Sequence, residues 1–238
     1  MDFDNLIKAV RYIFDDPDWV TKIGIMLVVN FAFGLTVWIL VGFVFLAAQI
    51  GWLIQLIRNM QAGIENPMPG WNDFGDKMQL GAGPLGAGFA YYLIPMIVSC
   101  LLFAPAVFAG ATSEEAGGIL ASGAACIVTP LLLVYAVGAG LLYTMGTIEY
   151  VSTENIGVYF NVSKLWGMVR EHSSAVIEYI VFSIIVSMAM SALGSTGVGA
   201  LVTGAFTVPI TGHLMGQLAI KIKGGGKKKK NINPEPAI

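Results

Sequence analysis

Residues 78–113 read MQLGAGPLGAGFAYYLIPMIVSCLLFAPAVFAGATS and include no charged side chain. Three further stretches share this property: 23–57, 116–148 and 179–220. Each is long enough to cross a hydrocarbon core of about 30 Å, because a crossing takes about 20 helical residues. Lipid offers no hydrogen-bond partner to the backbone, so these stretches are expected to be helices.

The composition of the whole chain agrees with this interpretation. Charged residues make up 12% of the 238 positions, about half the ~25% of an ordinary soluble domain, and hydrophobic residues make up 56%. The mean hydropathy is +0.74 and the net charge is −2. So little polar surface cannot solvate a globule of this size, so the sequence predicts an all-α, polytopic helical membrane protein rather than a soluble enzyme with an anchor.

The apolar stretches are best divided into three hairpins with about six transmembrane helices. The predicted spans are 23–40, 42–60, 86–109, 119–148, 175–193 and 198–221. We expect residues 1–222 to form a single integral membrane domain and residues 223–238 to form a flexible basic cytoplasmic tail. An alternative treats 23–57 as one span.

The positions of Lys and Arg give the predicted orientation. These residues occur at the termini and between the hairpins, whereas the proposed tips near 30–42, 110–118 and 194–197 contain none. Because basic residues are enriched in cytoplasmic connections, we expect a multi-pass protein of the cell membrane with both termini cytoplasmic. Treating 23–57 as one span fits this rule less well.

Short amphipathic helices are expected beside the hairpins. Apolar residues recur at spacings of three and four in 3–14 and 162–169, and more weakly in 71–80. Such helices are expected at the cytoplasmic interface, although chance similarity in apolar sequence remains an alternative. The predicted interfacial anchors are Trp19, Trp71, Phe74 and Trp166.

One longer motif carries a family resemblance. Residues 65–76 read ENPMPGWNDFGD, residues 14–19 read FDDPDW, and Arg58-Asn59 closes the first hairpin. With these features the chain, up to about residue 222, resembles the prokaryotic polytopic membrane proteins of domain-of-unknown-function family 4013. Gly70 stands where the resemblance leads us to expect an acidic residue. The resemblance implies no activity and no catalytic or ligand residue.

The same motif has a physical interpretation. Pro67 and Pro69 favour extended backbone before them and predict a rigid corner at the membrane surface. Asp73 is suited to cap a short helix beginning at Phe74. A docking surface for a partner is the alternative interpretation of the corner.

Polar side chains within the predicted spans are candidates for a functional site. His213 and Gln217 lie one turn apart in the last span, and Gln49 and Gln55 lie in the second. Together with helix-breaking Pro130 and Pro209, they would suit the substrate site of a transporter. Against this, no acidic or basic residue lies deep in a span, and interhelical hydrogen bonding is an alternative role for His213.

No enzyme or cofactor motif is convincing. Gly81 to Gly86 match the spelling GxGxxG, but no strand precedes them, so nucleotide binding is not expected. We expect no catalytic residue, no metal site and no cofactor. Small residues instead recur every four positions, as packing between helices in lipid favours: Ala82, Gly86 and Ala90; Ala136, Gly140 and Thr144; Ser195, Gly199 and Thr203.

The C-terminal lysines form a polybasic tail. They are Lys221, Lys223, Lys227, Lys228, Lys229 and Lys230. Such a run next to a span attracts anionic lipid, and fixing the topology is the alternative role. We expect no nucleic-acid partner.

Taken together, these features favour a non-enzymatic scaffold or subunit of a membrane assembly. Its expected partners are membrane lipids, other membrane protein subunits or further copies of itself. The alternative function is a small-molecule or lipid transporter, and a membrane enzyme ranks third.

Overall fold

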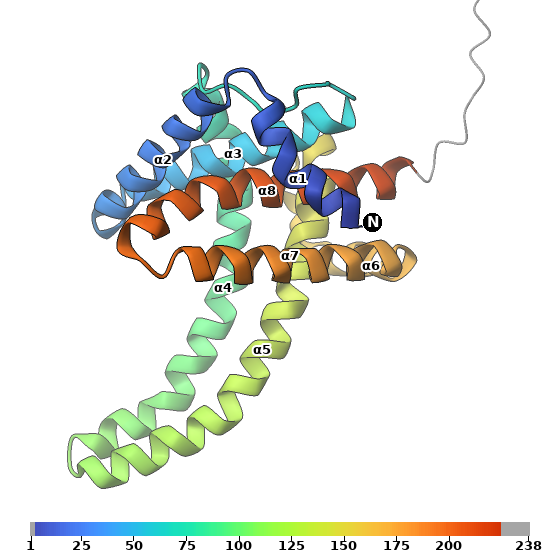
Figure 1. Cartoon of the computed structure of the whole chain (residues 1–238). Coiled ribbons are helices and arrows are strands. Elements are labelled where there is room, and N and C mark those ends of the chain that lie inside the picture. The colour runs from blue at the N-terminus through green and yellow to red at the C-terminus, as the bar shows by residue number, and fades with distance from the viewer. Residues whose placement is uncertain (1–2, 225–238) are drawn as a thin grey trace, which may run out of the picture. The chain divides into compact units, whose positions relative to one another are not determined.

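The computed structural model describes residues 3–224, which form α-helices, two short 3-10 helices and no strand (Figure 1). This confirms the all-α prediction. The elements are α1 (Phe3–Asp15), α2 (Trp19–Thr36), η1 (Val37–Ile39), α3 (Gly42–Gln61), α4 (Phe74–Gly110), α5 (Glu114–Thr153), η2 (Ile156–Phe160), α6 (Val162–Glu171), α7 (Ser173–Leu193) and α8 (Gly197–Gly224).

Five of these segments are long and apolar enough to cross a membrane: Trp19–Ile39, Gly42–Gln61, Phe74–Gly110, Glu114–Thr153 and Ser173–Leu193. The first apolar stretch therefore forms two helices, separated at Leu40 and Val41, rather than one. The predicted sixth span coincides with α8, which is not among these five segments; the structure does not describe the side chains of its residues 197, 198 and 201. The count of six stays a prediction.

The contacts divide the described chain into two compact units. One contains residues 3–81 and 167–224, and the other contains residues 82–166. We call them the core unit and the hairpin unit. The prediction that 1–222 acts as one membrane domain stays a prediction.

In the core unit, α8 lies against α1, α2, α3 and α7 (Figure 1). Glycines on α8 allow this close packing. A methyl group added at Gly212 would meet Leu56 and Leu53 of α3, and one added at Gly216 would overlap the sulfur atom of Met60 at the end of α3. The core of this unit therefore depends on the absence of side chains on one helix.

The first turns of α4 cross α3 with direct backbone contact. A Cβ atom at Gly51 would overlap the carbonyl oxygen of Lys77, and one at Gly81 would overlap that of Ala47. We expected a short, separate helix to begin at Phe74. A helix does begin there, but it continues without a break through Gly81 and Pro84 to the end of α4. The GxGxxG spelling is therefore helical and forms no phosphate-binding loop.

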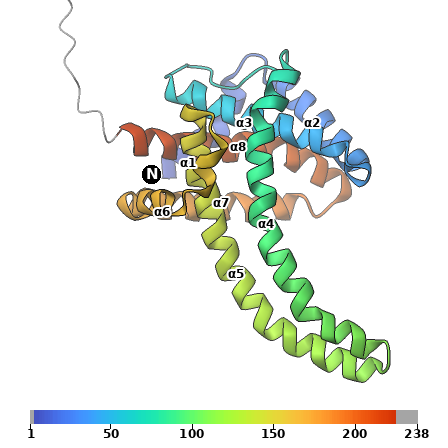
Figure 2. The same cartoon turned by 180° about the vertical axis from the view of Figure 1, so that it is seen from behind.

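The hairpin unit consists of most of α4, all of α5, η2 and the start of α6. Both long helices bend along their length, as Figure 2 shows, and Pro84, Pro95 and Pro105 in α4 and Pro130 in α5 are the residues expected to cause such bends. At the tip, the Ser113 side chain caps α5 by accepting a hydrogen bond from the Ala116 backbone N–H at 3.3 Å.

Candidate functional site

The clearest polar cluster in the core unit lies between α8 and α1. Nδ1 of His213 and Nε2 of Gln217 are 3.1 Å apart, as their spacing of one turn predicts. Nε2 of Gln217 also donates a hydrogen bond to the backbone oxygen of Asn5 at 3.0 Å. His213 is only 8% exposed, so the cluster is largely closed to its surroundings.

Tyr12 forms the cover of this cluster. Its ring stacks on the imidazole of His213 at a centroid distance of 4.3 Å, and its hydroxyl donates to the backbone oxygen of Pro209 at 3.0 Å. Burial, assisted by the negative charge of Asp16, raises the pKa of Tyr12 well above its usual value. Tyr12 is therefore a neutral hydrogen-bond donor at any physiological pH.

One acceptor in the cluster lacks a partner. Oε1 of Gln217 is buried and receives no hydrogen bond from the described residues. A buried amide oxygen without a donor costs about 1–3 kcal/mol.

The other two glutamines do not join this cluster. Gln55 donates through Nε2 to Oδ1 of Asn59 at 3.0 Å, and Asn59 in turn donates to the backbone oxygen of Pro67 at 2.8 Å. Gln49 is 5% exposed, and its Nε2 has no hydrogen-bond partner in the described part of the chain. Of the four predicted polar residues, only His213 and Gln217 are therefore in contact with each other.

A second polar cluster ties the corner after α3 to the loop before α2. Nζ of Lys22 lies 2.7 Å from Oδ2 of Asp16 and donates to the backbone oxygen of Met68 at 3.0 Å. Oδ1 of Asp16 accepts from the backbone N–H of Asp18 at 2.9 Å. Asp16 is 2% exposed, so this ion pair is internal to the protein.

Two indoles complete the corner. Nε1 of Trp52 donates to the backbone oxygen of Pro69 at 2.9 Å, and Nε1 of Trp71 donates to that of Lys22 at 3.1 Å. Their rings lie 6.1 Å apart and almost parallel. The two motifs that carry the family resemblance, 14–19 and 65–76, therefore meet at this corner.

The predicted interfacial anchors differ in exposure. Trp71 is 7% exposed and is engaged in the corner, whereas Trp166 is 46% exposed. Trp19 and Phe74 are half-buried, with Trp19 edge-on to Phe14. Their depth in a membrane stays a prediction.

The basic residues near the end of α8 are only partly described. Nζ of Lys221 forms an ion pair with Oε2 of Glu178 at 3.0 Å. Lys223 belongs to the last turn of α8, and Lys227, Lys228, Lys229 and Lys230 lie outside the described residues. Contact of these lysines with anionic lipid stays a prediction.

In the hairpin unit, tyrosines form a hydrogen-bonded cluster that the sequence did not reveal. The hydroxyl of Tyr91 donates to the backbone oxygen of Tyr159 at 2.6 Å, and that of Tyr159 donates to Oγ1 of Thr147 at 3.1 Å. The hydroxyl of Tyr135 donates to the backbone oxygen of Tyr91 at 2.7 Å. Burial raises the pKa of Tyr159, which lies in η2. The cluster joins α4, α5 and η2 through neutral donors.

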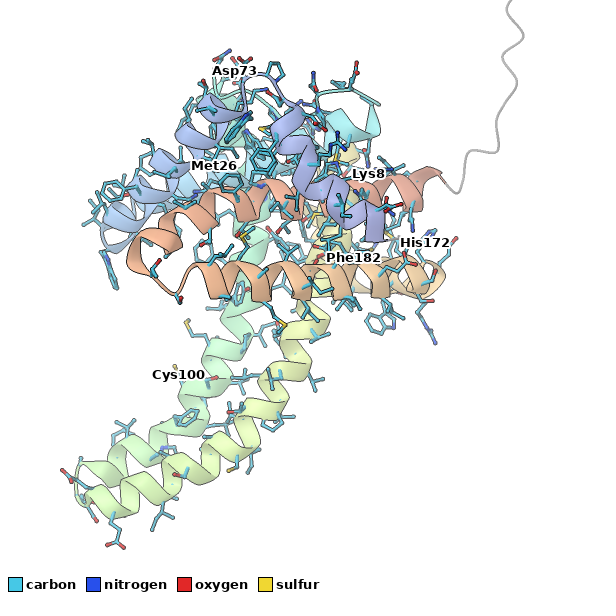
Figure 3. The ribbon with its side chains drawn as sticks, in the orientation of Figure 1. Lys8, Met26, Asp73, Cys100, His172 and Phe182 are labelled. Carbon is cyan, nitrogen blue, oxygen red and sulfur yellow. The ribbon has the colours of Figure 1, made fainter. Side chains whose placement is uncertain are left out.

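No group of three or more His, Cys, Asp or Glu side chains able to hold a metal ion occurs among residues 3–224. Cys100 and Cys126 are free and exposed, and Figure 3 shows Cys100 on the shaft of α4.

Five helices long and apolar enough to cross a membrane are characteristic of polytopic membrane proteins, and they place the chain in this class. More particularly, it belongs to the DUF4013 family of proteins of unknown function, whose model matches residues 34–203. That range includes the corner after α3 but not the 14–19 motif that contacts it. Neither the curated proteins nor the solved structures that were compared with the chain include a match.

Proposed function

We propose that the protein is a non-catalytic subunit of a membrane assembly, with both termini cytoplasmic, which binds other membrane proteins or further copies of itself through the α4–α5 hairpin. The orientation rests on the Lys and Arg residues of the connections. The assembly role rests on the surface of the hairpin unit.

The observation that carries the assembly role is a pair of open small-residue stripes. On α4 the stripe contains Ala82, Gly86 and Ala90, and on α5 it contains Ala136 and Gly140. A Cβ atom added at Gly86 or at Gly140 would meet no atom within 4 Å. Thr144, the third residue of the predicted stripe on α5, is buried at 7% exposure, so the open part of that stripe is Ala136 and Gly140. At Gly86 and Gly140 the stripes have no packing neighbour in the described chain.

Large side chains elsewhere on the hairpin distinguish the stripes from an ordinary lipid-facing surface. Exposed residues include Tyr92 at 76%, Leu101 at 69% and Val134 at 74%. Large apolar side chains pack well against lipid chains, whereas a stripe of small residues lets the backbone of another helix approach closely. The combination supports contact with helices of a further protein chain.

The test compares Gly86→Leu and Gly140→Leu with Gly24→Leu. Gly24 also has no neighbour within 4 Å, but it lies on α2, so the control adds the same side chain to another helix. Protein extracted from native membranes in a mild detergent is cross-linked and its mass is measured. We expect the two hairpin variants to lose the cross-linked species and Gly24→Leu to retain it. If the wild-type protein is monomeric after cross-linking and no other protein co-purifies with it, the proposal is contradicted.

A transporter is the second candidate, favoured by the unpaired Oε1 of Gln217 beside His213 and the helix-breaking Pro209. Protein-dependent uptake of a radiolabelled polar solute by proteoliposomes tests this function. If the double variant His213→Ala/Gln217→Ala retains the wild-type uptake rate, this cluster is not the transport site.

A further inference from the structure

The tip of the α2–α3 hairpin has no charged side chain, and the indole N–H of Trp38 is the one polar side-chain group among its residues. It consists of Val37, Trp38, Ile39, Leu40 and Val41, and four of these are exposed at 49–88%, including Trp38 at 88% and Leu40 at 72%. The tip of the α4–α5 hairpin instead reads Ala111 to Glu115, with Thr, Ser and two Glu residues. A turn that reaches water on the far side of a membrane is expected to resemble the second tip.

The length of the first hairpin explains the difference. From Lys22 to Leu40, at the apex of the tip, the chain rises about 27 Å, and from Arg58 back to Leu40 it also rises about 27 Å, at about 1.5 Å per residue. The hydrocarbon core is about 30 Å thick. Counted over their full length, Trp19–Ile39 and Gly42–Gln61 are each long enough to cross. Counted from the charged residues Lys22 and Arg58, the apex of the hairpin at Leu40 ends a few ångströms inside the far edge of the hydrocarbon core.

Lys22 cannot readily extend this reach. A free lysine could lie deeper in the membrane and direct its ammonium group toward the surface. Here Nζ is held by Asp16 at 2.7 Å and by the backbone oxygen of Met68 at 3.0 Å. The first turn of α2, which begins at Trp19, is thereby fixed at the level of the polar corner.

The second hairpin is long enough to cross. From Lys77 to Gly110 helix α4 rises about 50 Å, which exceeds the 40–45 Å or so of a complete bilayer with its headgroups. In each hairpin, the chemistry of the tip therefore agrees with the depth that the helix length allows.

Several backbone N–H groups of the first tip have internal partners, which an apolar medium favours because it offers none. The N–H groups of Val37, Leu40, Phe43 and Val44 donate to the backbone oxygens of Phe33, Val37, Leu40 and Val41, respectively. Leu40 takes a left-handed conformation, with φ of 64°, which allows the chain to turn within these few residues. The turn is therefore wound like a short helix rather than open like a loop.

We propose that the α2–α3 hairpin is re-entrant. It enters the bilayer at the level of Lys22, its tip binds the acyl chains of the opposite leaflet, and it returns without exposing Val37 to Val41 to water. The occupant of this surface is lipid hydrocarbon. The two termini remain on the same side, because a re-entrant hairpin, like two full spans, adds an even number of crossings.

The test is labelling of single cysteines by a membrane-impermeant maleimide. In a Cys100→Ala/Cys126→Ala background, Ile39→Cys is compared with Ala111→Cys, and Trp38→Cys serves as a second probe of the tip. Proteoliposomes are freeze–thawed with the reagent so that both faces meet it. All three variants are then labelled again in detergent, which shows that each thiol is reachable in the folded protein.

We expect Ala111→Cys to be labelled in both settings, and Ile39→Cys and Trp38→Cys to be labelled at least tenfold more slowly in proteoliposomes than in detergent. Labelling of either tip cysteine in proteoliposomes at the rate of Ala111→Cys would overturn the proposal.

Discussion

The first and second hairpins of this protein are stabilised in opposite ways. The α2–α3 hairpin is fixed at its base by an internal ion pair, two indole hydrogen bonds and a backbone crossing at Gly51, and its tip is apolar. The α4–α5 hairpin is joined by neutral tyrosine hydroxyls, has an acidic tip, and leaves most of its shaft exposed.

This difference separates two properties: affinity for the membrane and selection of one arrangement of the helices. Apolar length suffices to keep both hairpins in lipid, but it does not choose one arrangement of helices over another, since lipid tails are as apolar as leucine. The polar corner does select one arrangement, because its ion pair and its two indole hydrogen bonds form only when α2, α3 and the corner are aligned as observed. On the open shaft, the assembly proposed above would make that choice.

The largest expected effect is at the corner. In Lys22→Met, Asp16 would remain 2% exposed without its counter-charge, and breaking a buried pair in this way costs about 3–5 kcal/mol. We expect a corresponding fall in the free energy of unfolding, measured by SDS titration in mixed micelles. The matched control is Arg11→Ala, which removes an ion pair with Asp15 whose two side chains are 76% and 59% exposed and should cost at most about 1 kcal/mol.

The double variant Asp16→Asn/Lys22→Met sharpens the result. If the cost arises from an unpaired charge, removing both charges should restore part of the stability that Lys22→Met loses. Equal losses in the single and double variants would mean that packing, rather than charge, holds the corner.

A smaller effect is expected where the backbones of α3 and α4 meet. Gly51→Ala would place its methyl group on the carbonyl oxygen of Lys77, and overpacking of this kind costs about 1–3 kcal/mol. Gly86→Ala adds the same group where no atom lies within 4 Å, so it should be neutral or slightly stabilising as an improved helix residue. Thermal denaturation in detergent compares the two. Similar melting temperatures would show that the crossing is loose.

Much of the helical layout could be predicted from the sequence, because long charge-free stretches can satisfy lipid only as helices. The predicted breaks near 41, 110–118 and 194–197 each contain an observed break between two helices, although the second is shorter than predicted because α5 already begins at Glu114. The continuity of α4 from Phe74 was missed: the predicted span began only at residue 86, after Gly81, Gly83 and Pro84, which are poor helix residues in water. Glycine is needed at 51 and 81 because a Cβ atom at either position would overlap the backbone of the facing helix.

The candidate site was predicted only in part. The spacing of four between His213 and Gln217 sets their contact, so it could be read directly. The residues of α1 that cover this pair could not be predicted. Tyr12 and Asn5 lie about 200 residues earlier in the chain, and only tertiary packing brings them to α8. A spacing of seven does place Tyr12 and Asn5 on one helical face, and that was the available signal.

The smallest expected effect tests the tyrosine cluster that distinguishes the second hairpin. Pro95 has no N–H to donate to the backbone oxygen of Tyr91 one turn earlier, and the hydroxyl of Tyr135 donates to this oxygen at 2.7 Å. Tyr135→Phe should therefore cost about 1 kcal/mol in the free energy of unfolding, whereas Tyr92→Phe, at a residue 76% exposed, should cost nothing measurable. Pro95→Ala returns the missing N–H, so in that background Tyr135→Phe should lose most of its effect. An unchanged cost in the Pro95→Ala background would show that the hydroxyl of Tyr135 does not compensate for the proline, and that the bend of α4 is held by packing instead.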